Sequence, residues 1–136
     1  MIDAVLEKFG QLFERKRSVT TRAKRENEKA EKHFIFVSVE EFKKMEAAGA
    51  FIEVRHKDND YHGTSYAELQ RIKTAGKIPI IEVDCEGADK INLQALEANF
   101  LFIYPPTFEE LRKRIGNRIE TEKEFKLRIK EAISEI

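Results

Sequence analysis

Apolar residues recur along this chain with two spacings, one typical of helices and one typical of strands. Between Ile2 and Phe13 they lie three and four positions apart, which predicts an amphipathic helix that Gly10 ends or bends. Short continuous apolar runs predict three strands, at His33–Val37, Ile78–Val83 and Phe100–Tyr104. Because helices and strands alternate, we expect an α/β fold with a parallel sheet.

Four Ser or Thr residues are each followed by Glu three positions later. In this capping box the hydroxyl oxygen accepts a hydrogen bond from the first helical turn, so each pair predicts the start of a helix. The pairs are Ser38 with Glu41, Ser65 with Glu68, Thr107 with Glu110, and Thr121 with Glu124. Gly49 and Gly76 are expected to end the first two of these helices. Residues 84–89 are expected to form a turn that leads into another short helix.

The composition narrows the classes of function. The 136 residues include 25 basic and 25 acidic side chains, so the net charge is zero. No overall field then draws the chain to nucleic acid or to an anionic membrane, and we expect neither partner. The single cysteine, Cys85, fits a reducing compartment, and no segment approaches the roughly 20 apolar residues of a membrane span. We therefore expect one domain, residues 1–136, in the cytoplasm.

For two groups of polar residues we favour a purely structural interpretation, without a binding function. The basic run Arg15–Arg17 is expected to be a solvated face. A turn-rich segment contains potential metal ligands, namely His56, Asp58, Asp60 and His62, but Asp is common in turns for backbone reasons. We therefore expect no metal site there.

Three separated segments carry residues suited to binding a nucleotide. Arg22 and Arg25 lie beside hydroxyl groups, and two guanidinium groups at this spacing can converge on one phosphate. Glu53 follows an apolar pair of residues. Glu82 and Asp84 lie at the carboxyl end of a predicted strand, which is where open α/β sheets bind their ligands.

With their neighbours, these segments resemble the guanylate kinase family in order and in spacing. The matching pieces are Thr20-Thr21-Arg22 with Arg25, Phe36-Val37-Ser38, Gly49-Ala50-Phe51-Ile52-Glu53, Tyr61-His62-Gly63-Thr64, Gly76-Lys77 before the strand ending at Asp84, Phe102-Ile103-Tyr104-Pro105-Pro106, and Leu111 through Arg118. The resemblance implies a P-loop-kinase-like core with a parallel sheet. It also implies a small GMP-binding subdomain at approximately residues 20–80.

The resemblance further implies three groups of site residues. The phosphate of GMP is gripped in the family by residues that match Ser18, Arg22 and Arg25. The guanine base is contacted at the positions of Glu53 and Thr64, and acidic residues near the nucleotides and magnesium match Glu82 and Asp84. Lid arginines that neutralise the transferred phosphoryl group match Arg118 and Arg128.

The chain departs from the family at residues that surround the phosphate of GMP. Phe34 and His62 stand where the family has tyrosines, and Glu82 stands where it usually has aspartate. A lost hydrogen bond to a charged phosphate costs about 1.5–3 kcal/mol. We therefore expect GMP to bind at least about tenfold more weakly if nothing compensates.

A larger departure concerns the ATP side. The family begins with a strand leading into G-x-x-x-x-G-K-[ST], whose amides, lysine and hydroxyl hold the ATP phosphates and Mg²⁺. No Gly-x-x-x-x-Gly-Lys occurs in this sequence. The resemblance thus implies that the first strand and P-loop are missing, as are the family's last strand and helix. ATP and magnesium are expected as ligands only if further sequence supplies the loop.

The missing strand would leave a gap in the sheet. We expect either that the strands at 78–83 and 100–104 pair directly, or that a partner, a second copy or further sequence fills the gap.

The resemblance and the missing P-loop together suggest two possible functions. One is an incomplete ATP:GMP phosphotransferase, inactive as the chain stands. The other is a non-catalytic scaffold or binding module for GMP or a phosphorylated protein partner.

Overall fold

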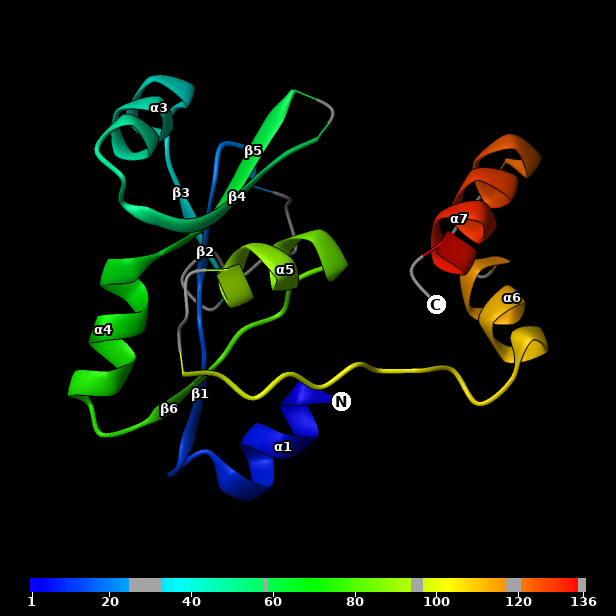
Figure 1. Ribbon diagram of the computed structural model, residues 1–136, viewed down its shortest axis with the longest axis horizontal. Helices are drawn as coiled ribbons and strands as arrows, with labels where there is room; N and C mark the ends of the chain where they lie inside the picture. The colour runs from blue at the N-terminus through cyan, green and yellow to red at the C-terminus, as the bar shows by residue number, and fades with distance from the viewer. Residues whose placement is uncertain (25–32, 58, 94–96, 117–120, 135–136) are drawn as a thin grey trace. The chain divides into compact units, whose positions relative to one another are not determined.

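The chain divides into two units, Met1–Glu97 and Ala98–Ile136. The computed structural model describes residues 1–24, 33–57, 59–93, 97–116 and 121–134 (Figure 1). All strands among these residues belong to the first unit, and two helices form the second. Arg25, Asp58 and Arg118, which the sequence analysis singles out, lie outside the described residues.

A four-stranded sheet forms the larger part of the first unit. Its strands are β2 (Ser18–Thr20), β3 (Phe34–Phe36), β4 (Phe51–Lys57) and β5 (Asp60–Ser65), in the spatial order β3-β2-β5-β4. β2 pairs with β3 in parallel, whereas β5 is antiparallel to both β2 and β4. The turn between β4 and β5 contains Asn59 at φ 69°, a conformation that Asn tolerates better than most residues.

A second, two-stranded sheet supplies the expected parallel pairing. β1 (Phe13–Arg15) runs parallel to β6 (Ile78–Ile80), with Phe13 opposite Ile78. The amide of Lys16 donates to the carbonyl of Ile80 at 3.1 Å, which carries the pairing one residue beyond β1. Because β2 begins at Ser18, this pairing leads the chain from one sheet into the other.

The helices begin where the capping boxes predict. Their bounds are α1 (Ile2–Phe9), α3 (Val39–Ala47), α4 (Tyr66–Thr74), α5 (Cys85–Leu93), α6 (Phe108–Gly116) and α7 (Glu122–Ser134). Ser38 accepts from the amide of Glu41 at 3.1 Å, and Ser65 accepts from that of Glu68 at 3.2 Å. Thr107 and Thr121 cap α6 and α7 in the same way. No helix in the described parts of the chain is long and apolar enough to span a bilayer.

Glycine ends two of these helices as expected. Gly49 and Gly76 have φ values of 67° and 72°, in the left-handed region where a side chain is strained. The chain then turns sharply into β4 after Gly49 and into β6 after Gly76. These turns place α3 and α4 next to the sheets.

The core of the first unit joins its helices to the four-stranded sheet. Phe42 of α3 is fully buried, and its ring stacks on Phe51 of β4 at 4.6 Å between centroids. Ile52, Leu69 and Ile91 form a second buried cluster, which brings together β4, α4 and α5. Burial of each such side chain contributes about 1.5–3 kcal/mol. The core therefore fixes β4 and β5 against the helices.

The strand expected at Phe100–Tyr104 does not form. In the described residues no strand pairs with this segment, and β6 pairs with β1 instead. Its side chains are exposed, with Leu101 at 87%. An apolar β-branched run is not sufficient for a strand, because its backbone groups need a partner strand to form hydrogen bonds. Within the first unit, the strand expected at 78–83 forms at Ile78–Ile80 and pairs with β1.

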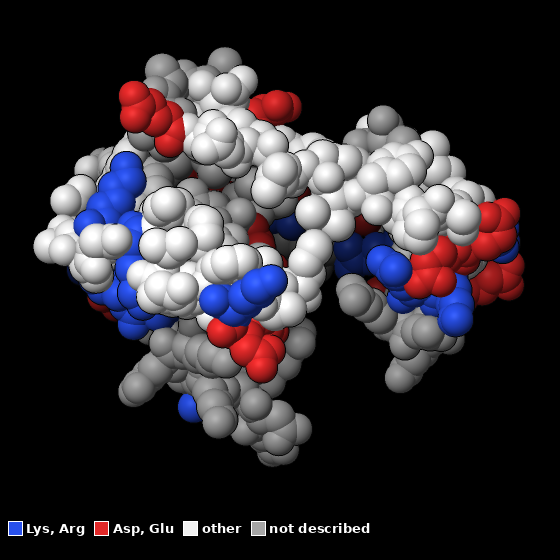
Figure 2. Space-filling view, turned by 90° about the horizontal axis from the view of Figure 1, so that it is seen from below, with Lys and Arg blue, Asp and Glu red and all other residues white. Residues whose placement is uncertain are grey.

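Charged side chains of both signs are interspersed rather than segregated. Among the described residues, four ion pairs join helical residues four positions apart, namely Glu40–Lys44, Glu86–Lys90, Glu110–Arg114 and Glu122–Lys126. Each such exposed pair contributes only about 0.3–0.5 kcal/mol. Figure 2 shows acidic and basic groups on the same face of each unit. This agrees with the zero net charge of the sequence.

Candidate functional site

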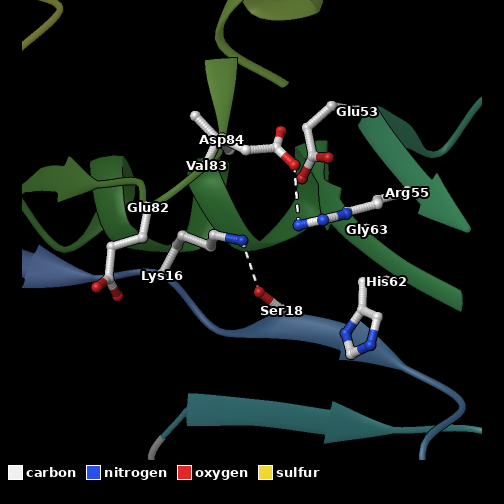
Figure 3. Close-up of a pocket in the computed structure, with 9 residues that line it drawn as sticks. All are labelled: Lys16, Ser18, Glu53, Arg55, His62, Gly63, Glu82, Val83 and Asp84. Atoms are coloured by element: carbon white, nitrogen blue, oxygen red, sulfur yellow. Dashed lines mark hydrogen bonds and ion pairs between the residues drawn. The ribbon is translucent and has the colours of Figure 1, made fainter. Parts of the chain in front are cut away.

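A pocket of about 230 Å³ in the first unit brings together all three segments that the sequence analysis singles out (Figure 3). Its lining comes from the chain before and within β2, from β4 and β5, and from the residues that follow β6. The lining residues are Lys16, Ser18, Glu53, Arg55, His62, Gly63, Glu82, Val83 and Asp84. Five of these are predicted site residues, namely Ser18, Glu53, His62, Glu82 and Asp84.

Glu53 lines the pocket and forms a hydrogen-bonded pair with Thr64. They are partners in the β4–β5 ladder, so the sheet itself holds them together. The Thr64 hydroxyl donates to Glu53 Oε1 at 2.6 Å, and Thr64 is fully buried. Since an ionised carboxylate has about four acceptor positions, Glu53 retains acceptors for a ligand after this hydrogen bond.

Lys16 is a pocket residue that the sequence analysis missed. It is only 5% exposed, and its Nζ donates to Ser18 Oγ at 2.6 Å and to Thr64 Oγ1 at 2.7 Å. Burial lowers the pKa of the Lys16 ammonium, while the carboxylates of Glu53 and Glu82 act in the opposite direction. The Lys16 ammonium group thus bridges Ser18, which is expected to bind the phosphate of GMP, and Thr64, which is expected to contact the guanine base.

The expectation of a solvated basic face at Arg15–Arg17 is wrong. Lys16 is buried, Arg17 binds the buried carboxylate of Glu68, and Arg15 forms an ion pair with Glu82. The spacing of Lys16 from Ser18 could have indicated that Lys16 belongs to the pocket. Lys16 lies two residues before Ser18, and residues two apart in an extended chain share a face. Arg55, also missed, lies two residues after Glu53 on β4.

The acidic pair at the end of β6 is engaged by arginines. Asp84 Oδ2 lies 2.8 Å from Arg55 Nη1, and Asp84 Oδ1 accepts from the amide of Gly87 at 2.9 Å. The second of these bonds caps the start of α5. Glu82 pairs with Arg15. Both carboxylates are therefore charge-compensated within the first unit.

Arg22 and two of its aromatic neighbours lie together beside the pocket. The Arg22 guanidinium lies over the ring of Phe34, 5.2 Å from its centroid, and the Phe34 and His62 rings are 6.4 Å apart. Burial lowers the pKa of His62, and the nearby charges of Arg22 and Arg55 lower it further. His62 is therefore neutral at pH 7. Phe34 lacks a hydroxyl but still packs against the arginine.

The remaining predicted residues do not line this pocket. Arg128 lies on α7 in the second unit, where its Nη1 is 3.4 Å from Glu131 Oε2, and Arg118 is not among the described residues. As for metals, the described residues contain no group of three or more His, Cys, Asp or Glu side chains arranged to hold an ion.

Comparison with known proteins places these observations in a family. The family model described as "Guanylate kinase" matches residues 1–136. The chain is 33% identical over 137 residues to "Guanylate kinase 1" of Oryza sativa subsp. japonica, and 39% identical over 120 residues to "Guanylate kinase" of Clostridium acetobutylicum. The crystal structure of guanylate kinase from Anaplasma phagocytophilum matches 82% of the chain with a TM-score of 0.65 and 32% sequence identity.

These matches also measure how much of each relative the chain spans. The alignments cover 100% of the chain but 36% of the rice protein, and 88% of the chain but 57% of the clostridial one. In the Anaplasma structure the matched part is 60% of that chain. The chain therefore spans roughly a third to three fifths of these relatives.

Proposed function

The chain belongs to the guanylate kinase family, and on that premise we propose that it provides the GMP-binding part of an ATP:GMP phosphotransferase acting in the cytoplasm. The observation that carries the proposal is the half-buried carboxylate of Glu53, which lines the pocket and is held by the buried hydroxyl of Thr64. A carboxylate that is partly removed from water and lines a cavity can take hydrogen-bond donors from a ligand.

Guanine supplies donors in the arrangement that Glu53 needs. Its N1–H and N2–H₂ groups are adjacent on one edge, so two parallel hydrogen bonds can reach one carboxylate. Adenine has an acceptor at N1 and would place its lone pair against the negative charge. Glu53 therefore selects guanine over adenine, and Thr64 fixes the position of the carboxylate through the 2.6 Å bond.

The phosphate of GMP is assigned to Ser18, Arg22 and Arg25. Arg22 follows β2 and lies over the ring of Phe34, and Ser18 of β2 is opposite Phe34 in the β2–β3 ladder, so both groups neighbour the same residue of β3. An oxygen of this phosphate attacks the γ-phosphorus of ATP, the bond from that phosphorus to the bridging oxygen breaks, and GDP and ADP form. The residues of this chain bind and orient the acceptor phosphate.

On the ATP side, Arg118 and Arg128 are assigned as the lid arginines, and ATP and magnesium would be held only if further sequence supplied a P-loop. Glu82 and Asp84 are paired with Arg15 and Arg55, so a magnesium ion would have to displace an arginine to reach either carboxylate. We therefore assign these two carboxylates to holding the pocket together and not to a metal.

A non-catalytic binding module is the second candidate. It is favoured by the fact that every lining residue of the pocket belongs to the first unit, so ligand binding needs nothing from the ATP side. In this case GMP or a phosphorylated protein partner occupies the pocket without transfer. The two candidates share the GMP site and differ in whether a longer version of the protein makes GDP.

A titration with nucleotides tests the GMP site, which both candidate functions share. We expect the chain to bind GMP in preference to AMP, and Glu53→Gln to weaken GMP binding by roughly tenfold to a hundredfold, because the amide NH₂ replaces an acceptor. Glu40→Gln is the matched control, since Glu40 is 79% exposed on α3 and should leave the affinity unchanged. Isothermal titration calorimetry measures all three. Equal binding of GMP and AMP would refute the base assignment.

A second assay separates the candidates. ADP release from ATP and GMP is measured for this chain and for the product of the longest reading frame that contains it. Activity in the longer product supports the phosphotransferase. If the longer product binds GMP and yet releases no ADP, the binding module is supported.

A further inference from the structure

A buried ammonium group lies at the centre of the pocket, and the family resemblance assigns it no role. Lys16 is 5% exposed, and its Nζ donates to Ser18 Oγ (Figure 3). The same Nζ also donates to Thr64 Oγ1. Burying a cation is costly unless something compensates its charge or its hydrogen bonds. A lysine in this position therefore calls for a function.

The hydrogens on Thr64 and Lys16 can be assigned individually. A threonine hydroxyl has one hydrogen, and Thr64 must give it to Glu53 Oε1, because a carboxylate only accepts. Lys16 then donates to the Thr64 oxygen and to Ser18, which uses two of its three hydrogens. In the described parts of the chain no third acceptor and no carboxylate within ion-pair distance is found for Lys16 Nζ. One hydrogen remains available for a ligand.

The charge of the other cation that lines the pocket is already paired. Arg55 Nη1 is 2.8 Å from Asp84, and His62 is neutral at pH 7 because burial lowers its pKa. Thr64 cannot donate to a ligand while its hydrogen is on Glu53. Among the described lining residues, Lys16 is therefore the cation that has no carboxylate within ion-pair distance, and it directly contacts the Glu53–Thr64 pair.

We propose, resting on the proposed function above, that Lys16 is a specificity-determining residue whose ammonium group donates to the 6-oxygen of guanine. Glu53 accepts from N1–H and N2–H₂, and the 6-oxygen is the next atom along the same edge. The pocket thus presents acceptor, acceptor and donor to the donor, donor and acceptor of guanine. Adenine carries an amino group at this position, and a buried cation beside that donor repels it.

A ligand pair that differs in one atom tests this contact. 6-Thioguanosine monophosphate keeps both donors and the phosphate of GMP but replaces the 6-oxygen with sulfur, a weak acceptor. We expect the whole chain to bind GMP on the order of tenfold more tightly than the thio analogue, as one charge-assisted hydrogen bond requires. Lys16→Met should bring the two affinities to within about twofold of each other.

Two further variants serve as a conservative substitution and as a control. Lys16→Gln keeps a neutral donor and should retain an intermediate preference for GMP, which also serves if Lys16→Met fails to fold in a thermal melt. Lys44→Met removes an exposed ammonium on α3, where Lys44 pairs with Glu40, and should leave the preference unchanged. Isothermal titration calorimetry at pH 7 measures each affinity.

The possible results distinguish failure of the Lys16 contact from failure of GMP binding itself. If GMP and its thio analogue lose affinity equally in Lys16→Met, Lys16 contacts the phosphate or only supports the fold, and the inference is overturned while GMP binding stands. Equal binding of the two ligands by the unaltered chain overturns it in the same way. If the unaltered chain does not bind GMP at all, the proposed function fails and the inference fails with it.

Discussion

Phe34 lies among the groups proposed to bind the phosphate of GMP, and its side chain has no hydroxyl group. The ring faces Ser18 across the β2–β3 ladder, and the Arg22 guanidinium lies over it, 5.2 Å from the centroid. The ring is therefore already among the groups assigned to the GMP phosphate. What it lacks, relative to the tyrosine of the family, is the phenolic hydroxyl.

We expect Phe34→Tyr to tighten GMP binding by about tenfold, because it adds one hydrogen bond to a charged phosphate. Guanosine, which has no phosphate, should bind with unchanged affinity, and titration calorimetry with both ligands makes the comparison. Phe36→Tyr is the matched control, since Phe36 lies on the same strand and its ring is 5.8 Å from Arg22. An equal gain for guanosine would show that the hydroxyl does not reach the phosphate.

At the scale of elements, Glu68 links α4 to the junction between β1 and β2. Its carboxylate accepts from the backbone and side chain of Arg17 and from Arg71, at distances of 2.9 to 3.1 Å, and the carboxylate is 3% exposed. Arg71 extends the network to Glu14 on β1. Burial alone would raise the pKa of Glu68, but the hydrogen bonds from Arg17 and Arg71 prevail and lower it to about 2.

This pKa predicts how stability changes in acid. A carboxyl whose pKa is lower in the folded state stabilises the fold above its unfolded pKa, near 4.5, and this stabilisation is lost as the pH falls toward 2. The contribution at pH 7 is about 3 kcal/mol. Glu68→Gln should lose roughly this amount in urea denaturation at pH 7, and its stability should vary less between pH 5 and pH 2.

Glu40→Gln provides the comparison for Glu68→Gln. It removes an exposed carboxylate that pairs with Lys44 one turn away, so its effect should stay below about 0.5 kcal/mol. Parallel acid profiles of Glu68→Gln and the unaltered chain would show that another group controls the loss of stability.

The elements that could be predicted from sequence are those formed by local interactions. Capping boxes depend on residues three positions apart, and all four mark a helix start in the structure. β1 was missed because Phe13–Arg15 contains one apolar residue and forms a strand by pairing with the distant β6. Phe100–Tyr104 is the converse case, an apolar run without a partner strand among the described residues.

The same distinction applies to the site. The family resemblance located Ser18, Glu53 and Thr64 residue by residue, and the structure brings them together. Lys16 was missed because its burial follows from the packing of β4 and β5 next to it, with Thr64 48 positions away in the sequence. A basic residue between two arginines looks solvated until the partners of all three are known.

At the scale of the whole molecule, the segment near the start of the second unit is the most exposed apolar run of the described chain. Phe100, Leu101, Phe102, Ile103 and Tyr104 are 48% to 87% exposed and belong to no helix or strand. Proteases cut exposed segments without regular structure far faster than helices or paired strands. Chymotrypsin, which cleaves after aromatic residues and leucine, should therefore cut first between Phe100 and Tyr104.

The fragment that begins at Met1 should keep the GMP site, because the pocket is lined wholly by residues of the first unit. We expect its affinity for GMP to lie within about twofold of that of the whole chain, since no contact that fixes Glu53, Thr64 or Lys16 involves the second unit. Mass spectrometry of the digest locates the cut, and calorimetry of the purified fragment measures the affinity. Early cleavage at the buried Phe42 would contradict the assignment of the core, and loss of GMP binding by the fragment would mean that the second unit takes part in recognising the nucleotide.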